Sequence, residues 1–169
     1  MVEAFVVVDH AMPSDRFEVA ATLIHDHPMM PKMTLTMSVD RESYLGEVAR
    51  ARTFCFEYEV AYLKSQGLAQ GGSLENAIVI GKDKFHTNSE GLRFADEFVR
   101  HKALDAIGDL ALAGAPILGA YRSIRGGHKL NHAVLTALIE DSSAWTITEG
   151  PKERVREHAA AIVSLSTPA

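Results

Sequence analysis

The stretch from Phe98 to Asp109 holds the residues best suited to chemistry. It reads Phe-Val-Arg-His-Lys-Ala-Leu-Asp-Ala-Ile-Gly-Asp and spaces His101, Asp105 and Asp109 four residues apart. At 100° per residue, Asp105 and Asp109 lie about 40° and about 80° around a helix from His101, so the three share one face. Imidazole and carboxylate groups bind divalent metal ions and transfer protons, and the spacing therefore predicts one of these two activities.

The opposite side of this helix is apolar and must pack on a core. It consists of Val99, Ala103, Ala106, Ile107 and Leu110. Such a helix does not bury two carboxylates and an imidazole unless they have partners. His101 and Asp105, at positions i and i+4, suit two ligands of one divalent ion. The alternative is a His–Asp hydrogen bond inside a core.

Composition limits the class of protein. The chain has 169 residues, 47% hydrophobic and 23% charged, which predicts a single globular domain with a core. A net charge of −5 gives no sign of a nucleic-acid-binding surface. One cysteine, Cys55, excludes a disulfide within the chain and is typical of a reducing compartment. No secretory signal or membrane-length apolar run is visible, so we expect a cytoplasmic protein.

Hydrophobic periodicity and turn residues predict an alternation of strands and helices. Strands are expected at 4–8, 17–24, 33–39, 53–56, 76–80, 84–87 and 117–123. Helices are expected at 41–51, 57–66, 95–112 and 128–140, and Pro151 starts a last amphipathic helix. This order predicts an α+β fold, a two-layer sandwich with helices on one face of a mixed or antiparallel sheet.

Several motifs carry a resemblance to a known family. They are Ala49-Arg-Ala-Arg-Thr-Phe54, Tyr62-Leu-Lys-Ser-Gln-Gly-Leu68, Gly71-Gly-Ser73, Asn76-Ala-Ile-Val79, Glu90-Gly-Leu-Arg-Phe94, Asp96-Glu-Phe-Val-Arg-His-Lys102, Leu104-Asp-Ala-Ile-Gly-Asp-Leu110 and Gly127-His128. With these motifs in order over residues 17–145, the chain resembles the second, C-terminal domain of UDP-3-O-acyl-N-acetylglucosamine deacetylase, the zinc amidase of lipid A synthesis. Residues 151–169 have no clear counterpart and are expected to form an extra helix or tail.

The resemblance implies a metal-dependent hydrolase and gives roles to the matching residues. His101 and Asp105 would be two of three zinc ligands, although a His and Asp set also admits iron(II) or manganese. Asp109 and His128 would form a charge-stabilising pair in which Asp109 orients the imidazole. Thr53 would hydrogen-bond the tetrahedral intermediate.

Three more matching positions would contact a small substrate, either acylated or nucleotide-linked. Phe54 resembles a wall of the substrate site, and Lys102 resembles a substrate-contacting lysine. Arg125 stands where the family usually has a lysine, a replacement that suits phosphate contact with a different geometry.

The chain also departs from the family pattern. The family's first domain supplies the third zinc ligand, a histidine, and an adjacent glutamate base, and neither has a counterpart here. The only adjacent Glu-His pair is Glu157-His158, in the tail. Cys55 replaces a glycine, and His132 replaces an asparagine.

Three groups admit a second interpretation. Cys55 is interpreted as a core thiol, with a nucleophile as the alternative. His25 and His27 could bind one ion only if both left an extended segment on one side, so a structural loop is favoured. His128 and His132, at i and i+4, could share an additional ligand site.

Three functions compete at this point. The first is a deacetylase-like metalloenzyme whose site is completed by another chain, and the second is a remodelled metalloenzyme with different chemistry in a biosynthetic pathway. The third is a non-catalytic binding or regulatory subunit. Retention of the set His101, Asp105, Asp109 and His128 argues against the third, because buried charge is costly to keep without a use.

We also expect an oligomer, either a homodimer through the helix layer or a complex with a first-domain-like chain. Phe98 and Leu112 flank the metal face at about 60° and about 20° on the same helical wheel, and both should be exposed in a monomer. Two ligands leave zinc short of the usual three protein ligands, and a histidine from a second chain could supply the third.

Overall fold

The computed structural model describes residues 5–8 and 16–147. The helix expected from Pro151 and the pair Glu157-His158 lie outside the described residues. The chain divides into two compact units, residues 1–136 and 137–169. The expected division into a core over 17–145 and a tail over 151–169 stays a prediction.

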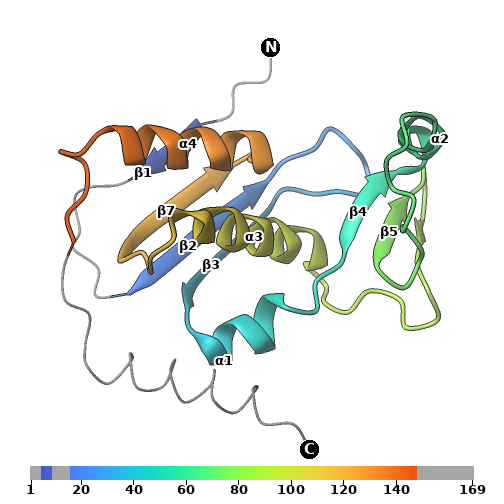
Figure 1. Cartoon of the computed structure of the whole chain (residues 1–169). Helices are drawn as coiled ribbons and strands as arrows, with labels where there is room; N and C mark the ends of the chain where they lie inside the picture. The colour runs from blue at the N-terminus through green and yellow to red at the C-terminus, as the bar shows by residue number, and fades with distance from the viewer. Residues whose placement is uncertain (1–4, 9–15, 148–169) are drawn as a thin grey trace, which may run out of the picture. The chain divides into compact units, whose positions relative to one another are not determined.

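A mixed four-stranded sheet forms one layer, as expected (Figure 1). Its strands, in spatial order, are β1 (Phe5–Val8), β7 (Gly119–Ile124), β2 (Phe17–Leu23) and β3 (Met33–Val39). β2 runs parallel to β7, and the other two pairs are antiparallel. Alternation in β2 buries Val19, Ala21 and Leu23, because side chains of a strand alternate between its two faces. These three residues face the helix layer of the core.

A second, smaller sheet contains β4 (Thr53–Phe56), β5 (Ala77–Ile80) and β6 (Phe85–His86). β4 and β5 are parallel, and α2 (Glu57–Ser65) lies in the crossover that parallel strands need. β5 and β6 are antiparallel and joined by a tight turn. The sequence predicts these strands but not their separation from the larger sheet.

The helix expected after Asp40 is only partly regular. Asp40 caps α1 (Arg41–Ser43), and Tyr44–Val48 continues as a π-helix. The Glu47 carbonyl, near the end of this turn, accepts a hydrogen bond from Arg100 Nη1 at 3.0 Å. The expected helix to residue 51 therefore ends early, at Val48, and a turn follows in which the Ala51 backbone N donates to the Val48 carbonyl at 2.9 Å.

The central helix, α3 (Glu97–Leu110), packs across β2 and β3 (Figure 1). A single 3-10 turn, Ala111–Ala113, extends it, and Gly114 ends it with φ of 74°. Most of the predicted apolar side is buried, namely Val99, Ala103, Ala106 and Leu110. The face assigned to the core by periodicity is therefore confirmed.

The expectation that Phe98 is exposed is wrong. Phe98 is fully buried, with ring centroids 5.1 Å from Phe54 and 5.2 Å from Phe85. Both rings belong to the smaller sheet, which covers the first turn of α3 and which helical periodicity cannot reveal. Leu112 is 68% exposed, as expected.

The helix expected at 128–140 is α4 (His128–Glu140). Asn131 and Leu135 are its buried residues, and Tyr121 of β7 donates a hydrogen bond from its hydroxyl to Asn131 Oδ1 at 2.6 Å. This contact fixes the first turns of α4 against the larger sheet. None of the helices within 5–8 and 16–147 combines the length and apolar character needed to cross a membrane.

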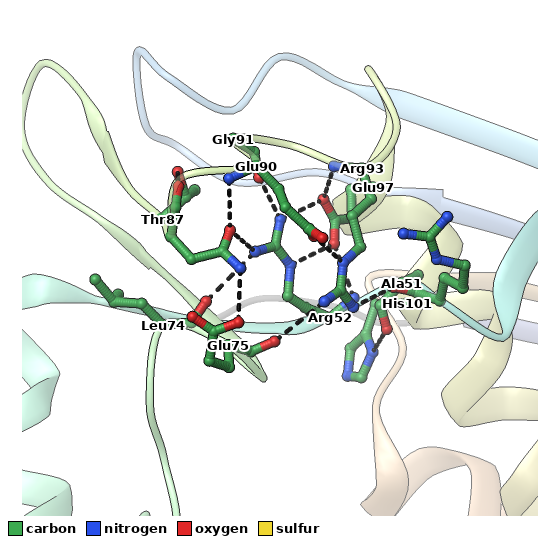
Figure 2. Close-up of polar contacts among 12 residues, drawn as sticks. Ala51, Arg52, Leu74, Glu75, Thr87, Glu90, Gly91, Arg93, Glu97 and His101 are labelled. Atoms are coloured by element: carbon green, nitrogen blue, oxygen red, sulfur yellow. Dashed lines mark hydrogen bonds and ion pairs between the residues drawn. The ribbon is translucent and has the colours of Figure 1, made fainter.

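A buried ion pair joins the segment before β4 to the start of α3 (Figure 2). Glu97 is fully buried, and Arg52 is 3% exposed. Glu97 Oε1 accepts from the backbone N and from Nε of Arg52, at 3.0 and 2.9 Å. Glu97 Oε2 accepts from Arg52 Nη2 at 3.1 Å and from the Arg93 backbone N at 2.6 Å. Burial alone would raise the pKa of Glu97, but these hydrogen bonds lower it below its usual value.

This lowered pKa predicts loss of stability in acid. The unfolded chain takes up a proton at Glu97 near its ordinary pKa of 4.5, whereas the folded chain does so only at lower pH. The stabilisation is present above pH 4.5 and declines as the pH falls toward the folded pKa, by about 1 kcal/mol per pH unit from this group.

Urea unfolding between pH 3 and pH 7 measures the effect. In Glu97→Gln, the free energy of unfolding should depend less on pH in the acidic range than it does in the wild type. Glu90→Gln, in an exposed pair with Arg93, should leave this pH dependence unchanged. If the free energy of unfolding falls with pH equally steeply in Glu97→Gln and the wild type, Glu97 does not cause this pH dependence.

Candidate active site

α3 brings His101 and Asp105 together, as their spacing predicts. His101 Nε2 lies 3.2 Å from Asp105 Oδ1. The other ring nitrogen, Nδ1, lies 3.1 Å from the Ala51 carbonyl oxygen. A carbonyl only accepts hydrogen bonds, so Nδ1 carries the proton and the neutral ring keeps its lone pair on Nε2.

The two facing atoms of this pair fit a bound cation. Burial lowers the pKa of His101, outweighing the Asp105 carboxylate, which raises it. A neutral His101 then directs a lone pair at a carboxylate oxygen, a contact that is repulsive unless a proton or metal ion lies between them. Imidazole nitrogen and carboxylate oxygen are donors that zinc accepts. The other oxygen of Asp105 accepts from Lys102 Nζ at 2.8 Å.

The described residues supply two such donors at this place, not three. Across the described part of the chain, no group of three or more His, Cys, Asp or Glu side chains is arranged to hold a metal ion. A closed structural zinc site is therefore not formed by these residues, whereas an open site with donors from elsewhere remains compatible with them.

A second His–Asp pair lies beside the first. His128 Nδ1 is 2.8 Å from Asp109 Oδ2, and His128 Nε2 is 4.0 Å from Asp105 Oδ1. Asp109 Oδ2 also accepts from Asn131 Nδ2 at 2.8 Å. Asp109 therefore fixes the ring of His128 through Nδ1 and leaves Nε2 facing the first pair.

The Asp109 carboxylate is held in its charged form. Burial alone would raise its pKa, but hydrogen bonds from Asn131 and His128 lower it below its usual value. His132 Nε2 lies 3.3 Å from Asp109 Oδ1, so both histidines of α4 reach the same carboxylate. His128 and His132 are 65% and 52% exposed at their side chains, whereas Asp109 is 12% exposed. The imidazoles thus line the open side of the site.

Phe54 and Lys102 form the wall next to the His101–Asp105 pair. Lys102 Nζ lies 5.5 Å from the centroid of the Phe54 ring, and the rings of Phe54 and His101 are 6.5 Å apart. Thr53 and Phe54 also line a groove of about 470 Å³ on the smaller sheet. The site and this groove therefore share Phe54.

Arg125 is not hydrogen-bonded into this cluster in the part of the chain that the structure describes. It is exposed, has φ of 54°, and among the described residues makes no hydrogen bond with the His–Asp groups. Burial and the positive charges of Lys102 and Arg125 lower the pKa of His25, so both cationic side chains lie close enough to His25 to affect its charge. His27 Nδ1 accepts from the Met29 backbone N at 3.2 Å, as befits a structural loop.

Sequence reasoning missed the buried partners of the site. Asn131 and Tyr121 support Asp109, and Glu97 and Arg52 lie next to the Ala51 carbonyl. Asn131 follows His128 by three residues, a spacing that places it on the same helix face and could have identified it. Cys55 is half-buried and lines the groove on the smaller sheet, not the core, so the expected core thiol is not found. Burial raises the pKa of Cys55, which disfavours the alternative of a thiolate nucleophile.

The fold and the site together define an α+β domain with two adjoining His–Asp pairs, an arrangement suited to hydrolytic chemistry. The family of UDP-3-O-acyl N-acetylglycosamine deacetylase matches residues 3–140. The chain belongs to this family.

Curated relatives named UDP-3-O-acyl-N-acetylglucosamine deacetylase match most of the chain. The protein of Nitratiruptor sp. is 50% identical over 81% of this chain and 46% of its own length. The protein of Neisseria gonorrhoeae is 48% identical over 81% of this chain and 45% of its own length. The protein of Campylobacter fetus is 44% identical over 88% of this chain and 50% of its own length. The chain thus spans about half the length of these relatives and corresponds to a single domain of the deacetylase.

Proposed function

We propose that the chain is the metal-binding half of a deacetylase that acts on an acylated, nucleotide-linked N-acetylglucosamine in the cytoplasm. The names of the relatives support this substrate class. The observation that carries the proposal is the proximity of the His101–Asp105 pair to the Asp109–His128 pair, with His128 Nε2 4.0 Å from Asp105 Oδ1. Zinc is the proposed ion, with iron(II) or manganese as alternatives.

The proposed mechanism divides the work between the two pairs. His101 and Asp105 would hold the ion, which when bound supplies a Lewis acid for an amide carbonyl and lowers the pKa of water. The imidazolium of His128, fixed by Asp109, would stabilise negative charge on the carbonyl oxygen and give a proton to the leaving amine. Thr53 would donate a hydrogen bond to the same oxygen.

Three side chains would hold the substrate beside these pairs. Phe54 lies next to His101 and offers an apolar wall. Lys102 and Arg125 carry positive charge that would attract the phosphates of a nucleotide.

A second chain would complete the site. Two protein donors are fewer than the three usual for catalytic zinc, and a glutamate base is also needed. The partner would be a second copy or a first-domain-like chain, and it would cover exposed apolar side chains such as Leu112. The contact of His132 with Asp109 favours a second candidate, a remodelled metalloenzyme with different chemistry.

Metal analysis and a deacetylation assay test this proposal together. We expect the chain to bind about one zinc ion per site, and to deacetylate only as an oligomer or after addition of the N-terminal half of a relative. Light scattering on the zinc-loaded protein measures the assembly. A zinc-loaded monomer with full activity at micromolar concentration would show that the chain completes its own site. Absence of metal and of activity in every mixture would reject the enzyme.

A further inference from the structure

We propose that Glu97 is a positioning residue for His101, acting through the peptide group that joins Ala51 to Arg52. The proposal rests on the metal-binding role proposed for His101. Glu97 itself contacts neither the imidazole nor the Asp105 carboxylate in any hydrogen bond among the described residues.

One peptide group makes both hydrogen bonds. Its N–H, from Arg52, donates to Glu97 Oε1 at 3.0 Å, and its C=O, from Ala51, accepts from His101 Nδ1 at 3.1 Å. A peptide group is planar and rigid, so fixing the N–H also fixes the direction of the carbonyl. The orientation of the His101 ring therefore depends on the position of the Glu97 carboxylate (Figure 2).

The carboxylate is itself held from several sides. Arg52 reaches both of its oxygens, and the Arg93 backbone N donates to Oε2 at 2.6 Å. Arg52 in turn donates to the Gly91 carbonyl and to Asn88 Oδ1. Glu97 and His101 lie four residues apart on α3 and so face the same segment. The network leaves the carboxylate no freedom to turn away from the peptide.

This arrangement affects the electronic state of His101 as well as its position. Hydrogen bonds in a chain polarise one another in a low-dielectric interior, and the negative charge of Glu97 lies at the far end of this chain. Polarisation of the Ala51 carbonyl strengthens its bond to the Nδ1 proton and makes Nε2 a better donor to a metal ion. Carboxylates and carbonyls that accept from the distal nitrogen of a ligating histidine have this effect in metal sites.

The first test measures the tautomer of His101 in the metal-free wild-type chain. A long-range ¹H–¹⁵N correlation spectrum distinguishes a proton on Nδ1 from one on Nε2. We expect the Nδ1–H tautomer at neutral pH. A proton on Nε2 would overturn the proposal, and this measurement needs no variant that risks misfolding.

The second test compares Glu97→Gln with Asn88→Ala. Both loosen the Arg52 network, but only Glu97→Gln removes the charge that acts on the Ala51–Arg52 peptide. Glu97→Gln should shift the His101 ring resonances and weaken zinc binding by about 10-fold to 100-fold, measured by competition with a chelator. Asn88→Ala should leave the ring resonances and zinc affinity close to those of the wild type.

The readouts separate this proposal from the proposed function. If wild-type chain binds no zinc, the metal-site proposal fails, whereas the response of the His101 resonances to Glu97→Gln still decides the positioning role. If folded Glu97→Gln keeps both the resonances and the zinc affinity of the wild type, or if Asn88→Ala changes them equally, Glu97 has only a structural role.

Discussion

Replacing His101 with alanine should remove stoichiometric zinc from the chain and abolish deacetylation. His101 is one of two donors offered at the proposed site, and its Nε2 lies 3.2 Å from the other, Asp105. Loss of one of two donors leaves a single carboxylate, which holds zinc only weakly in water. Elemental analysis after gel filtration measures the bound metal, and an amide-hydrolysis assay measures activity.

His86→Ala provides the matched control for this experiment. His86 lies in β6 and pairs with Glu57 at 3.7 Å, away from the proposed donors. This variant should keep its zinc and its activity. Full retention of zinc by His101→Ala, with the control unchanged, would reject the assignment of His101 as a ligand.

Asp109→Ala should lower kcat by about 100-fold to 10,000-fold, the range that a positioned general acid or base contributes. Asp109 holds His128 Nδ1 at 2.8 Å and would stabilise the imidazolium form. Its removal leaves Nδ1 of the ring without this hydrogen-bond partner and the ring free to turn. The effect on KM should be smaller, because the pair acts mainly on charge that develops in the transition state.

Asp96→Asn is the control for this change, since Asp96 occupies the N-cap position of the same helix and pairs with Arg100, outside the two His–Asp pairs. It should alter kcat little, because Asp96 and Arg100 bind each other and make no hydrogen bond with the two His–Asp pairs among the described residues. A kcat of Asp109→Ala close to that of the wild type would remove the Asp109–His128 pair from the mechanism. A rise in KM alone would assign the pair to substrate binding.

The regular elements could be predicted from the sequence because their signals are local. Periodicity placed the apolar side of α3 on the sheet, and the spacing of His101, Asp105 and Asp109 placed them on one face. Motif resemblance placed His128 beside Asp109, which periodicity alone could not do.

The remaining features depend on contacts between distant segments. Phe98 occupies an exposed position on a helical wheel but is covered by Phe54 and Phe85, which arrive from the smaller sheet. Glu97 resembles an ordinary acidic residue in the first turn of a helix until the fold brings Arg52 against it. Arg52 and Glu97 are 45 positions apart in the sequence, and local patterns carry no information about such a contact.

The acceptor that meets His101 Nδ1 belongs to the main chain at Ala51. No substitution of the side chain at position 51 can delete a backbone carbonyl. Neither sequence variation nor saturation mutagenesis at position 51 can therefore reveal this hydrogen bond. Position 51 would register in such a scan only through the size limit that its buried methyl group imposes. Substitutions at the residues that orient the carbonyl would instead disrupt the contact. A mutational scan of this site would therefore show its largest effects one residue or more away from Ala51.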